Sequence, residues 1–380
     1  MKSLAAVVLV CLALALGCGG GSSSNKSNPY NPNVNWLPLL GPGTWLGVVK
    51  PEGHVGAPKA LIEAAFNECL RSGVKAYQYS IAWSELEKVP GVIDASRLDL
   101  DLAVLQTHNL AIYLNIPTIN RNRLALPYDL VDPQNPDRLA PGLKFDSREV
   151  LDRFGRVLDR VVPILVARGG FFLSIGQEID VYLAANSGAV NDFINFTGVA
   201  RNRVKGLDSR LGVGVNFGFR ALEVMPSTIP KFLSHGDAAS FNYYPLYVDY
   251  RARPPEDVDG DLDRLLNSSQ GLPLLLQEAG YTSGYHPTPT NGSSQEWQRR
   301  FMMNLIRGVK KRPRIRFCSV IQLADWTDET VDRLMLYYGA SAPLFREYLA
   351  GLGLLFKDGS PKTSYETFLV EAAQLDSAGD

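Results

Sequence analysis

An α/β fold of the (β/α)8, or TIM, barrel type is predicted by the alternation of strand and helix patterns along the chain. Eight short apolar runs have strand character, and eight parallel strands close such a barrel. These runs cover residues 44–49, 76–82, 110–117, 170–176, 211–217, 238–244, 272–277 and 316–323. An open, doubly wound sheet shows the same alternation, but residues 47–58 lack the G-x-G-x-x-G spacing of a dinucleotide site. The barrel is therefore favoured.

In the stretches between the strand-like runs, apolar residues recur at the spacing of a helix. After the first run, apolar residues recur at Ile62, Ala65 and Phe66. Before the fourth run, the same spacing continues over residues 150–161. Two long connections, residues 120–145 and 281–294, would lie at the C-terminal rim of the barrel and wall a cleft there.

The composition is that of an ordinary globular protein. The chain has 380 residues, of which 46% are hydrophobic, so it can bury one large core. Its formal net charge is -1 and it carries no dense Lys/Arg cluster, which argues against nucleic acid as a partner.

Residues 1–17 have the pattern of a lipoprotein signal peptide. Lys2 precedes an apolar run at 4–16 that is too short to span a bilayer, and Ala-Leu-Gly-Cys follows at 15–18. This site resembles a bacterial lipobox, which implies lipidation of Cys18. We expect a protein anchored by lipid in the bacterial cell envelope, with plain secretion as the alternative, and contact with a membrane only through that anchor.

Residues 18–35 are rich in Gly, Ser, Asn and Pro and are expected to form a flexible tether before the barrel domain at 36–380. Two cysteines remain in that domain, Cys69 and Cys318, and their spacing is not that of a metal site. Two buried free thiols are the simpler interpretation, and a disulfide in an exported protein is the alternative.

Two glutamates end strand-like runs. Glu178 closes LSIGQE at 173–178, and Glu278 closes LPLLLQE at 272–278. Barrel enzymes keep their chemistry at the C-terminal ends of strands, and glycoside cleavage generally needs two carboxylates. A single glutamate at such a place is usually a solvated rim residue, but two of them predict a catalytic pair.

The motifs around these glutamates resemble those of glycoside hydrolase clan A. YQYSIAWSELE at 77–87 is similar to the second-strand motif, SFNYYPL at 240–246 to the sixth and IQLADW at 321–326 to the eighth. The tail at 353–368 resembles the final turn and helix of many clan A domains. The resemblance runs from Trp45 to Phe368.

In this clan the acid/base follows the fourth strand and the nucleophile follows the seventh, so Glu178 and Glu278 take these roles. The resemblance implies hydrolysis of a β-linked polysaccharide or oligosaccharide with retention of configuration, without metal or cofactor, and we expect a monomer. Tyr-Tyr-Pro at 243–245 and Glu-Ala-Gly-Tyr at 278–281 resemble most the endo-galactanases of family 53. Families 5 and 113 are near neighbours.

Aromatic side chains near strand ends are candidates for stacking on sugar rings. The resemblance places Trp326 under the sugar beside the scissile bond and gives Tyr243 or Tyr244 a contact with the nucleophile. Trp83 is as well suited to core packing as to stacking. Asn115 could bind a sugar hydroxyl or cap a loop, and the same two interpretations hold for Asn120, Arg121, Asp325 and Asp328.

Two positions depart from the clan pattern. Gln177 stands where an Asn before the acid/base usually binds the sugar 2-hydroxyl, and Gln78 stands where an Arg usually lies near the nucleophile. Loss of the Arg removes a cation that keeps Glu278 ionised. These departures leave open a catalytically inactive carbohydrate-binding lipoprotein on the same barrel, and a barrel hydrolase or lyase acting on another bond is a third possibility.

Overall fold

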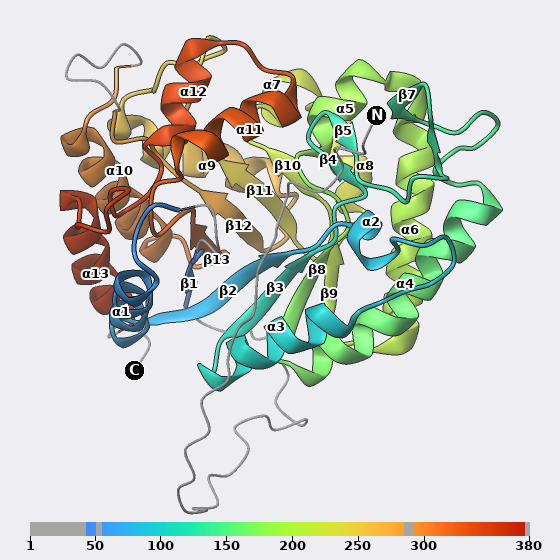
Figure 1. The fold of residues 1–380 in the computed structure, drawn as a ribbon, viewed down its shortest axis with the longest axis horizontal. Coiled ribbons are helices and arrows are strands. Elements are labelled where there is room, and N and C mark those ends of the chain that lie inside the picture. Colours follow the sequence, from blue (N-terminus) through green and yellow to red (C-terminus); the bar gives the residue numbers. More distant parts are fainter. Residues whose placement is uncertain (1–42, 51–54, 285–291, 377–380) are drawn as a thin grey trace, which may run out of the picture.

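The computed structural model describes residues 43–50, 55–284 and 292–376, and their strands form a parallel barrel (Figure 1). The strands follow one another around the barrel as β1 (Trp45–Val48), β2 (Val74–Ser80), β3 (Ala111–Asn115), β8 (Gly170–Ser174), β9 (Gly212–Gly214), β10 (Asn216–Gly218), β11 (Ala239–Tyr243), β12 (Leu274–Ala279) and β13 (Ile315–Val320). Because β9 pairs with β8, β10 pairs with β11 and only Val215 separates β9 from β10, these two segments are parts of one strand. All eight strands expected from the sequence are therefore present, and the predicted fold class is confirmed.

The helices surround the barrel and cover the outer faces of its strands (Figure 1). The larger ones are α1 (Lys59–Arg71), α3 (Ser96–Thr107), α4 (Arg148–Ala167), α6 (Val190–Leu207), α9 (Val258–Ser268), α10 (Gln295–Lys310) and α13 (Thr363–Asp376). In α4, Val150, Phe154, Val157 and Val161 are buried, as their helical spacing predicts. The C-terminal helix α13 packs against α10 and α1, which closes the ring.

Two apolar layers hold the barrel together. Inside it, Tyr113 stacks on Phe317 with ring centroids 5.4 Å apart, and Phe172 and Leu275 pack in the same cluster. A larger cluster fills the space between the strands and the helices. Parallel strands that are covered on both faces are apolar along their whole length. They therefore appear in the sequence as short apolar runs.

Short elements gather at the C-terminal ends of the strands. The connection after β3 contains two small hairpins, β4 (Ile119–Asn120) with β5 (Arg123–Leu124) and β6 (Val131–Asp132) with β7 (Asn135–Leu139). The other short helices are α2 (Trp83–Leu86), α5 (Ile179–Ala185), α7 (Ala221–Val224), α8 (Ile229–Leu233), α11 (Asp328–Tyr338) and α12 (Pro343–Ala350). In Figure 1, α5, α7, α11 and α12 lie along the upper edge of the barrel.

The predicted signal peptide, the tether and Cys18 lie outside the described residues, and so does part of the connection at 281–294. None of the helices in the described ranges is long and apolar enough to cross a membrane. Cys69 and Cys318 are buried free thiols, as the simpler interpretation expected. Burial raises the pKa of each thiol to about 12, so both stay protonated at neutral pH.

Candidate active site

A cavity of about 600 Å³ opens where the strands end. Its lining residues come from the ends of β1, β2, β8, β10, β11, β12 and β13, from the loop after β3, and from α11 and α12. Both Glu178 and Glu278 lie in its wall. The position and size are those of a small-molecule site on a barrel.

Glu178 is presented by a tight turn between β8 and α5. It adopts a left-handed conformation with φ of 44°, and its backbone N–H donates to Asn216 Oδ1 at 3.2 Å. Gly176 makes the turn possible, because a Cβ atom there would lie 2.6 Å from Ile179 Cγ2. The Glu178 carboxylate therefore leaves the end of β8 pointing into the cleft instead of continuing the strand.

Glu278 lies on β12 and accepts three hydrogen bonds. Gln177 Nε2 donates to Oε1 at 2.9 Å, and Asn242 Nδ2 and Tyr244 Oη donate to Oε2 at 2.9 Å and 2.7 Å. The pairing register of β12 shifts between Leu276 and Ala279, at the place where this carboxylate turns into the cleft. Three donors on one carboxylate hold it in a fixed orientation.

Asn242 links the two carboxylates. The same Nδ2 atom that donates to Glu278 lies 3.1 Å from Glu178 Oε1. The two carboxylate oxygens are therefore no farther apart than the sum of these distances, about 6 Å, which is below the ~6.5–9.5 Å separation of inverting pairs and compatible with the ~5–5.5 Å of retaining pairs. A reacting carbon can contact both groups.

The electrostatic setting of Glu278 is unusual because its donors are neutral. Burial and the nearby charge of Glu178 raise the pKa of Glu278 to about 7, against the opposing effect of the hydrogen bonds from Tyr244 and Gln177. Gln78 lies in the cleft wall on β2, as expected. Neutral donors, the amides of Gln177 and Asn242 and the phenol of Tyr244, thus contact the nucleophile candidate where the clan pattern has an arginine.

A cation is present on the other side of the pair. Arg121 Nε lies 3.6 Å from Glu178 Oε2. The guanidinium lies 5.2 Å from the ring centre of Tyr338 and 5.1 Å from that of Phe345. Its position is set by the backbone, because the Arg121 N–H donates to Gln177 O at 2.8 Å. Arg121 was considered for a sugar-hydroxyl contact or a loop cap, and its guanidinium lies in the cleft wall beside a carboxylate.

Asp180 adds a third carboxylate in the first turn of α5. It is buried, its Oδ1 accepts from the Gly218 N–H at 2.7 Å, and it lines the cleft. Burial and the neighbouring Glu178 raise the pKa of Asp180 to about 7. Glycine at 218 leaves room for both groups, because an added Cβ would lie 3.3 Å from Asp180 Oδ2 and 3.7 Å from the Glu178 carboxyl carbon.

An amide network behind the pair holds Gln177. Its Oε1 accepts from Gln277 Nε2 at 2.9 Å and from Asn115 Nδ2. Gln277 Oε1 in turn accepts from the hydroxyl of Tyr113 at 2.9 Å, inside the barrel. Because both ends of the Gln177 amide are occupied, this side chain orients Glu278, and the extra methylene relative to Asn gives it the reach to do so.

Tyr244, Trp326 and Gln177 line the cleft, as the sequence predicted. Three other predicted ligands do not. Trp83 is wholly buried in α2, where its indole donates to Glu87 at 2.7 Å. Tyr243 is buried against the outer helices and donates to Asp261 at 3.0 Å. The structure therefore places Trp83 in the core, which was the alternative to stacking, and of the two tyrosines it places Tyr244 beside Glu278 and Tyr243 in the core. Asn115 contacts Gln177 instead of lining the cleft.

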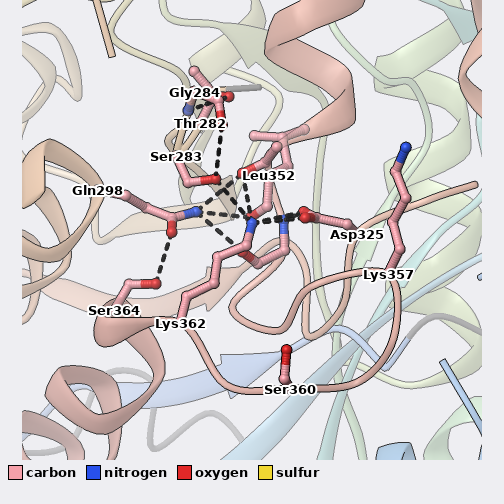
Figure 2. Close-up of polar contacts among 12 residues, drawn as sticks. Thr282, Ser283, Gly284, Gln298, Asp325, Leu352, Lys357, Ser360, Lys362 and Ser364 are labelled. Atoms are coloured by element: carbon pink, nitrogen blue, oxygen red, sulfur yellow. Dashed lines mark hydrogen bonds and ion pairs between the residues drawn. The ribbon is translucent and has the colours of Figure 1, made fainter. Parts of the chain in front are cut away.

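Asp325, beside Trp326, belongs to a buried polar cluster behind the cleft (Figure 2). Its carboxylate pairs with Lys362 Nζ at 2.8 Å and accepts from the Gly353 N–H at 2.7 Å. Lys362 Nζ also donates to Ser283 Oγ at 3.0 Å. These contacts tie the loop after β13 to the start of α13, so Asp325 supports the wall that carries Trp326.

The remaining candidates have structural contacts or lie elsewhere. Asp328 begins α11 and pairs with Lys357 at 2.7 Å, and Asn120 lines the cleft with its amide 3.3 Å from the Tyr337 hydroxyl. Within the described ranges, no cluster of three or more His, Cys, Asp and Glu side chains is arranged to hold a metal ion.

Sequence reasoning missed Asn242 and Asp180, and it had no reason to pair Arg121 with Glu178. Asn242 lies within the SFNYYPL motif, two residues before Tyr244. An alternating polar pattern at the end of a buried strand was the available signal, since residues two apart share a face. Two buried atoms in the cleft wall, Asn242 Oδ1 and Gln322 Nε2, have no hydrogen-bond partner among the described residues.

Neither a family model nor a curated protein matches the sequence. Solved structures do match the fold. The GH5_18 protein (glycoside hydrolase family 5) of Bifidobacterium longum in complex with Manβ1-4GlcNAc superposes with a TM-score of 0.65 and 13% identity, over 87% of this chain and 78% of that one. GH5_18 from Streptomyces cattleya in complex with GlcNAc gives 0.65 and 13% over 88% and 80%.

A β-glucuronidase from Bacteroides uniformis matches with a TM-score of 0.57 and 14% identity, and this chain spans 35% of its length. The matches to family 5 agree with the resemblance to clan A barrels, and they give no specific support to family 53. At this level of identity the likeness shows a shared fold.

Proposed function

We propose that this protein is a glycoside hydrolase that cleaves a β-linked sugar with retention of configuration. The observation that carries the proposal is the joint hydrogen bonding of Glu178 and Glu278 by one amide nitrogen, which keeps one oxygen of each carboxylate within about 6 Å of the other, a separation compatible with retaining pairs. Their position at the C-terminal ends of β8 and β12 in a barrel of this type supports it.

In the first step Glu278 attacks the anomeric carbon. The donors Gln177, Asn242 and Tyr244 hold its carboxylate in place. Glu178 gives its proton to the leaving oxygen, so the glycosidic C–O bond breaks as the bond to Glu278 forms. Arg121 lies next to the negative charge that this proton transfer leaves on Glu178.

In the second step Glu178 removes a proton from a water molecule. That water attacks the anomeric carbon from the face that the leaving group vacated, and the bond to Glu278 breaks. Two inversions return the sugar to its original configuration. The step starts from an ionised Glu178, with the Arg121 guanidinium beside it.

The sugar to test first comes from the structural neighbours, which were solved with Manβ1-4GlcNAc and GlcNAc. Reducing sugar should be released from a panel of β-mannosyl, β-galactosyl, β-glucosyl and β-xylosyl substrates by the barrel domain. The matched control is Glu278→Gln, which keeps the size of the side chain but removes the nucleophile. Release that this variant abolishes supports the proposal, and release that it leaves unchanged contradicts it.

Gln177 and Gln78 favour one rival, a barrel that binds sugar without cleaving it. The Gln177 amide hydrogen-bonds to Glu278, Asn115 and Gln277, so it is not free to bind the sugar 2-hydroxyl as the clan pattern would have it. Binding of sugars to the unmutated domain with no product over long incubation would favour this rival. Whether the barrel cleaves sugar or only binds it, a lipid anchor at Cys18 is a separate proposal. Mass spectrometry of Cys18 tests it.

A further inference from the structure

The two sides of the cleft differ in chemistry. The ends of β1, β2 and β13 contribute polar side chains, among them Lys50, Gln78, Ser80 and Gln322. Trp326 lies on the same side, after β13. A sugar ring needs convergent hydrogen-bonding groups together with one flat apolar surface, and this side supplies both.

Apolar side chains predominate on the opposite side. We use the name leaving-group wall for the lining residues Val181, Ala184, Phe219, Val224, Leu246, Tyr247 and Val248. They come from α5, directly after Glu178, and from the loops after β10 and β11, which are neighbouring strands. The charged lining residues that α5 and these two loops contribute are Asp180 and Arg220.

The rim of this wall exposes large apolar side chains to solvent. Val248 is 69% exposed, and Val224 and Tyr247 are each 46% exposed. Exposed aliphatic groups that continue a cavity are typical of a binding surface. Such side chains suit an apolar group better than a sugar, whose hydroxyls would lose water without finding hydrogen-bonding partners.

Local contacts hold the rim in place without a ligand. Leu246 pairs with Ala252 across a hairpin, and the Tyr247 N–H donates to Arg251 O at 2.9 Å. One face of the Tyr247 ring is covered by the Arg251 guanidinium at 5.6 Å. On the neighbouring loop, Glu223 pairs with Arg264 at 3.3 Å. The wall is therefore a preformed surface.

The position of the leaving-group wall relative to Glu178 determines which part of the substrate contacts it. Whichever glycoside is cleaved, the acid/base must reach the leaving oxygen, so the leaving group lies on the side of Glu178. The wall begins on the helix that follows Glu178. From the geometry we infer that the leaving group is apolar: an alkyl, aryl or lipid aglycone instead of a further sugar. This inference rests on the proposed function and narrows its substrate class.

The test separates binding from turnover. The Glu278→Gln protein is titrated calorimetrically with n-alkyl β-D-glucopyranosides from methyl to octyl, below the concentration of micelle formation. Affinity should rise with each methylene by up to about fourfold, the ratio that corresponds to the about 0.8 kcal/mol of a buried methylene group. In the unmutated protein, kcat/KM for alkyl glycosides should rise in the same way and exceed that for the disaccharide with the same glycone.

Two substitutions place a charge on the wall, Val224→Asp and Val248→Asp, at positions exposed enough to leave folding intact. Both substitutions should reduce the dependence of affinity on the length of the alkyl chain. Val89→Asp is the matched control, since Val89 is 59% exposed and does not line the cleft. The inference would be overturned if affinity did not change from the methyl to the octyl glycoside. It would also be overturned if Val89→Asp reduced the dependence on chain length as much as the two wall substitutions do. Chain-length-dependent binding without turnover would support the apolar site and contradict the hydrolase.

Discussion

Asn242 Nδ2 hydrogen-bonds to both Glu178, at 3.1 Å, and Glu278, at 2.9 Å, and so limits the distance between the two carboxylates. An amide cannot be charged, so it holds two acidic groups together without deciding which of them carries the proton. That arrangement suits a mechanism in which Glu178 gives up its proton in one step and regains it in the next.

Asn242→Ala should lower kcat by about 100-fold, because removal of one positioned donor at a reacting group typically costs this much. The fold should persist, and the KM should change less than kcat. Steady-state kinetics on the best substrate of the panel measure both. Asn304→Ala is the control, since the Asn304 amide donates to Pro255 O outside the cleft. A variant at 242 with unchanged kcat would refute the role of Asn242 in positioning the pair.

Adjacent tyrosines provide a matched comparison. Tyr244→Phe removes a donor to Glu278, so we expect kcat to fall by about 10- to 100-fold with little change in stability. Tyr243→Phe removes a donor to the buried Asp261, so we expect a loss of about 1–2 kcal/mol in unfolding free energy and normal activity. Kinetics and urea unfolding of both variants check this. The opposite pattern would show that the assignment of the two tyrosines is reversed.

Stability should depend on pH through Glu278. Its pKa is raised to about 7 in the folded protein, above the about 4.3 of an unfolded chain. A raised carboxyl pKa contributes stability that is fully present below about pH 4.3 and is lost as the pH rises through about 7. Glu278→Gln lacks this loss, so its unfolding free energy at pH 8 should exceed that of the unmutated protein, by on the order of 1–3 kcal/mol.

At pH 4, Glu278→Gln should not exceed the unmutated protein in unfolding free energy. Chemical denaturation of both proteins at pH 4 and pH 8 measures this. Glu366→Gln on α13 removes one exposed carboxylate outside the cleft and serves as the control for a change in net charge. Equal stabilisation by Glu278→Gln at pH 4 and pH 8 would show that packing, and not the buried charge, is responsible.

The fold was predictable because each buried strand produces an apolar run of the right length, and the spacing of the helical stretches supplies the rest. The two glutamates were predictable because they end such runs. Tyr243 could not be told from Tyr244 because a strand covered on both faces has no polar side to show which residues point outward. Trp83 follows β2 in the short helix α2, and an aromatic residue there suits core packing and stacking equally. Arg121 reaches Glu178 through a backbone contact between two loops, and sequence spacing does not encode that contact.

The configuration of the first product tests the central claim most directly. Proton NMR of the reaction follows the anomeric signal of the released sugar before it mutarotates. The account predicts that the β anomer appears first and the α anomer follows at the rate of spontaneous mutarotation, because two displacements at one carbon restore its configuration. An α anomer as the first product would require a single displacement by water, and it would contradict the role of Glu278 as the nucleophile.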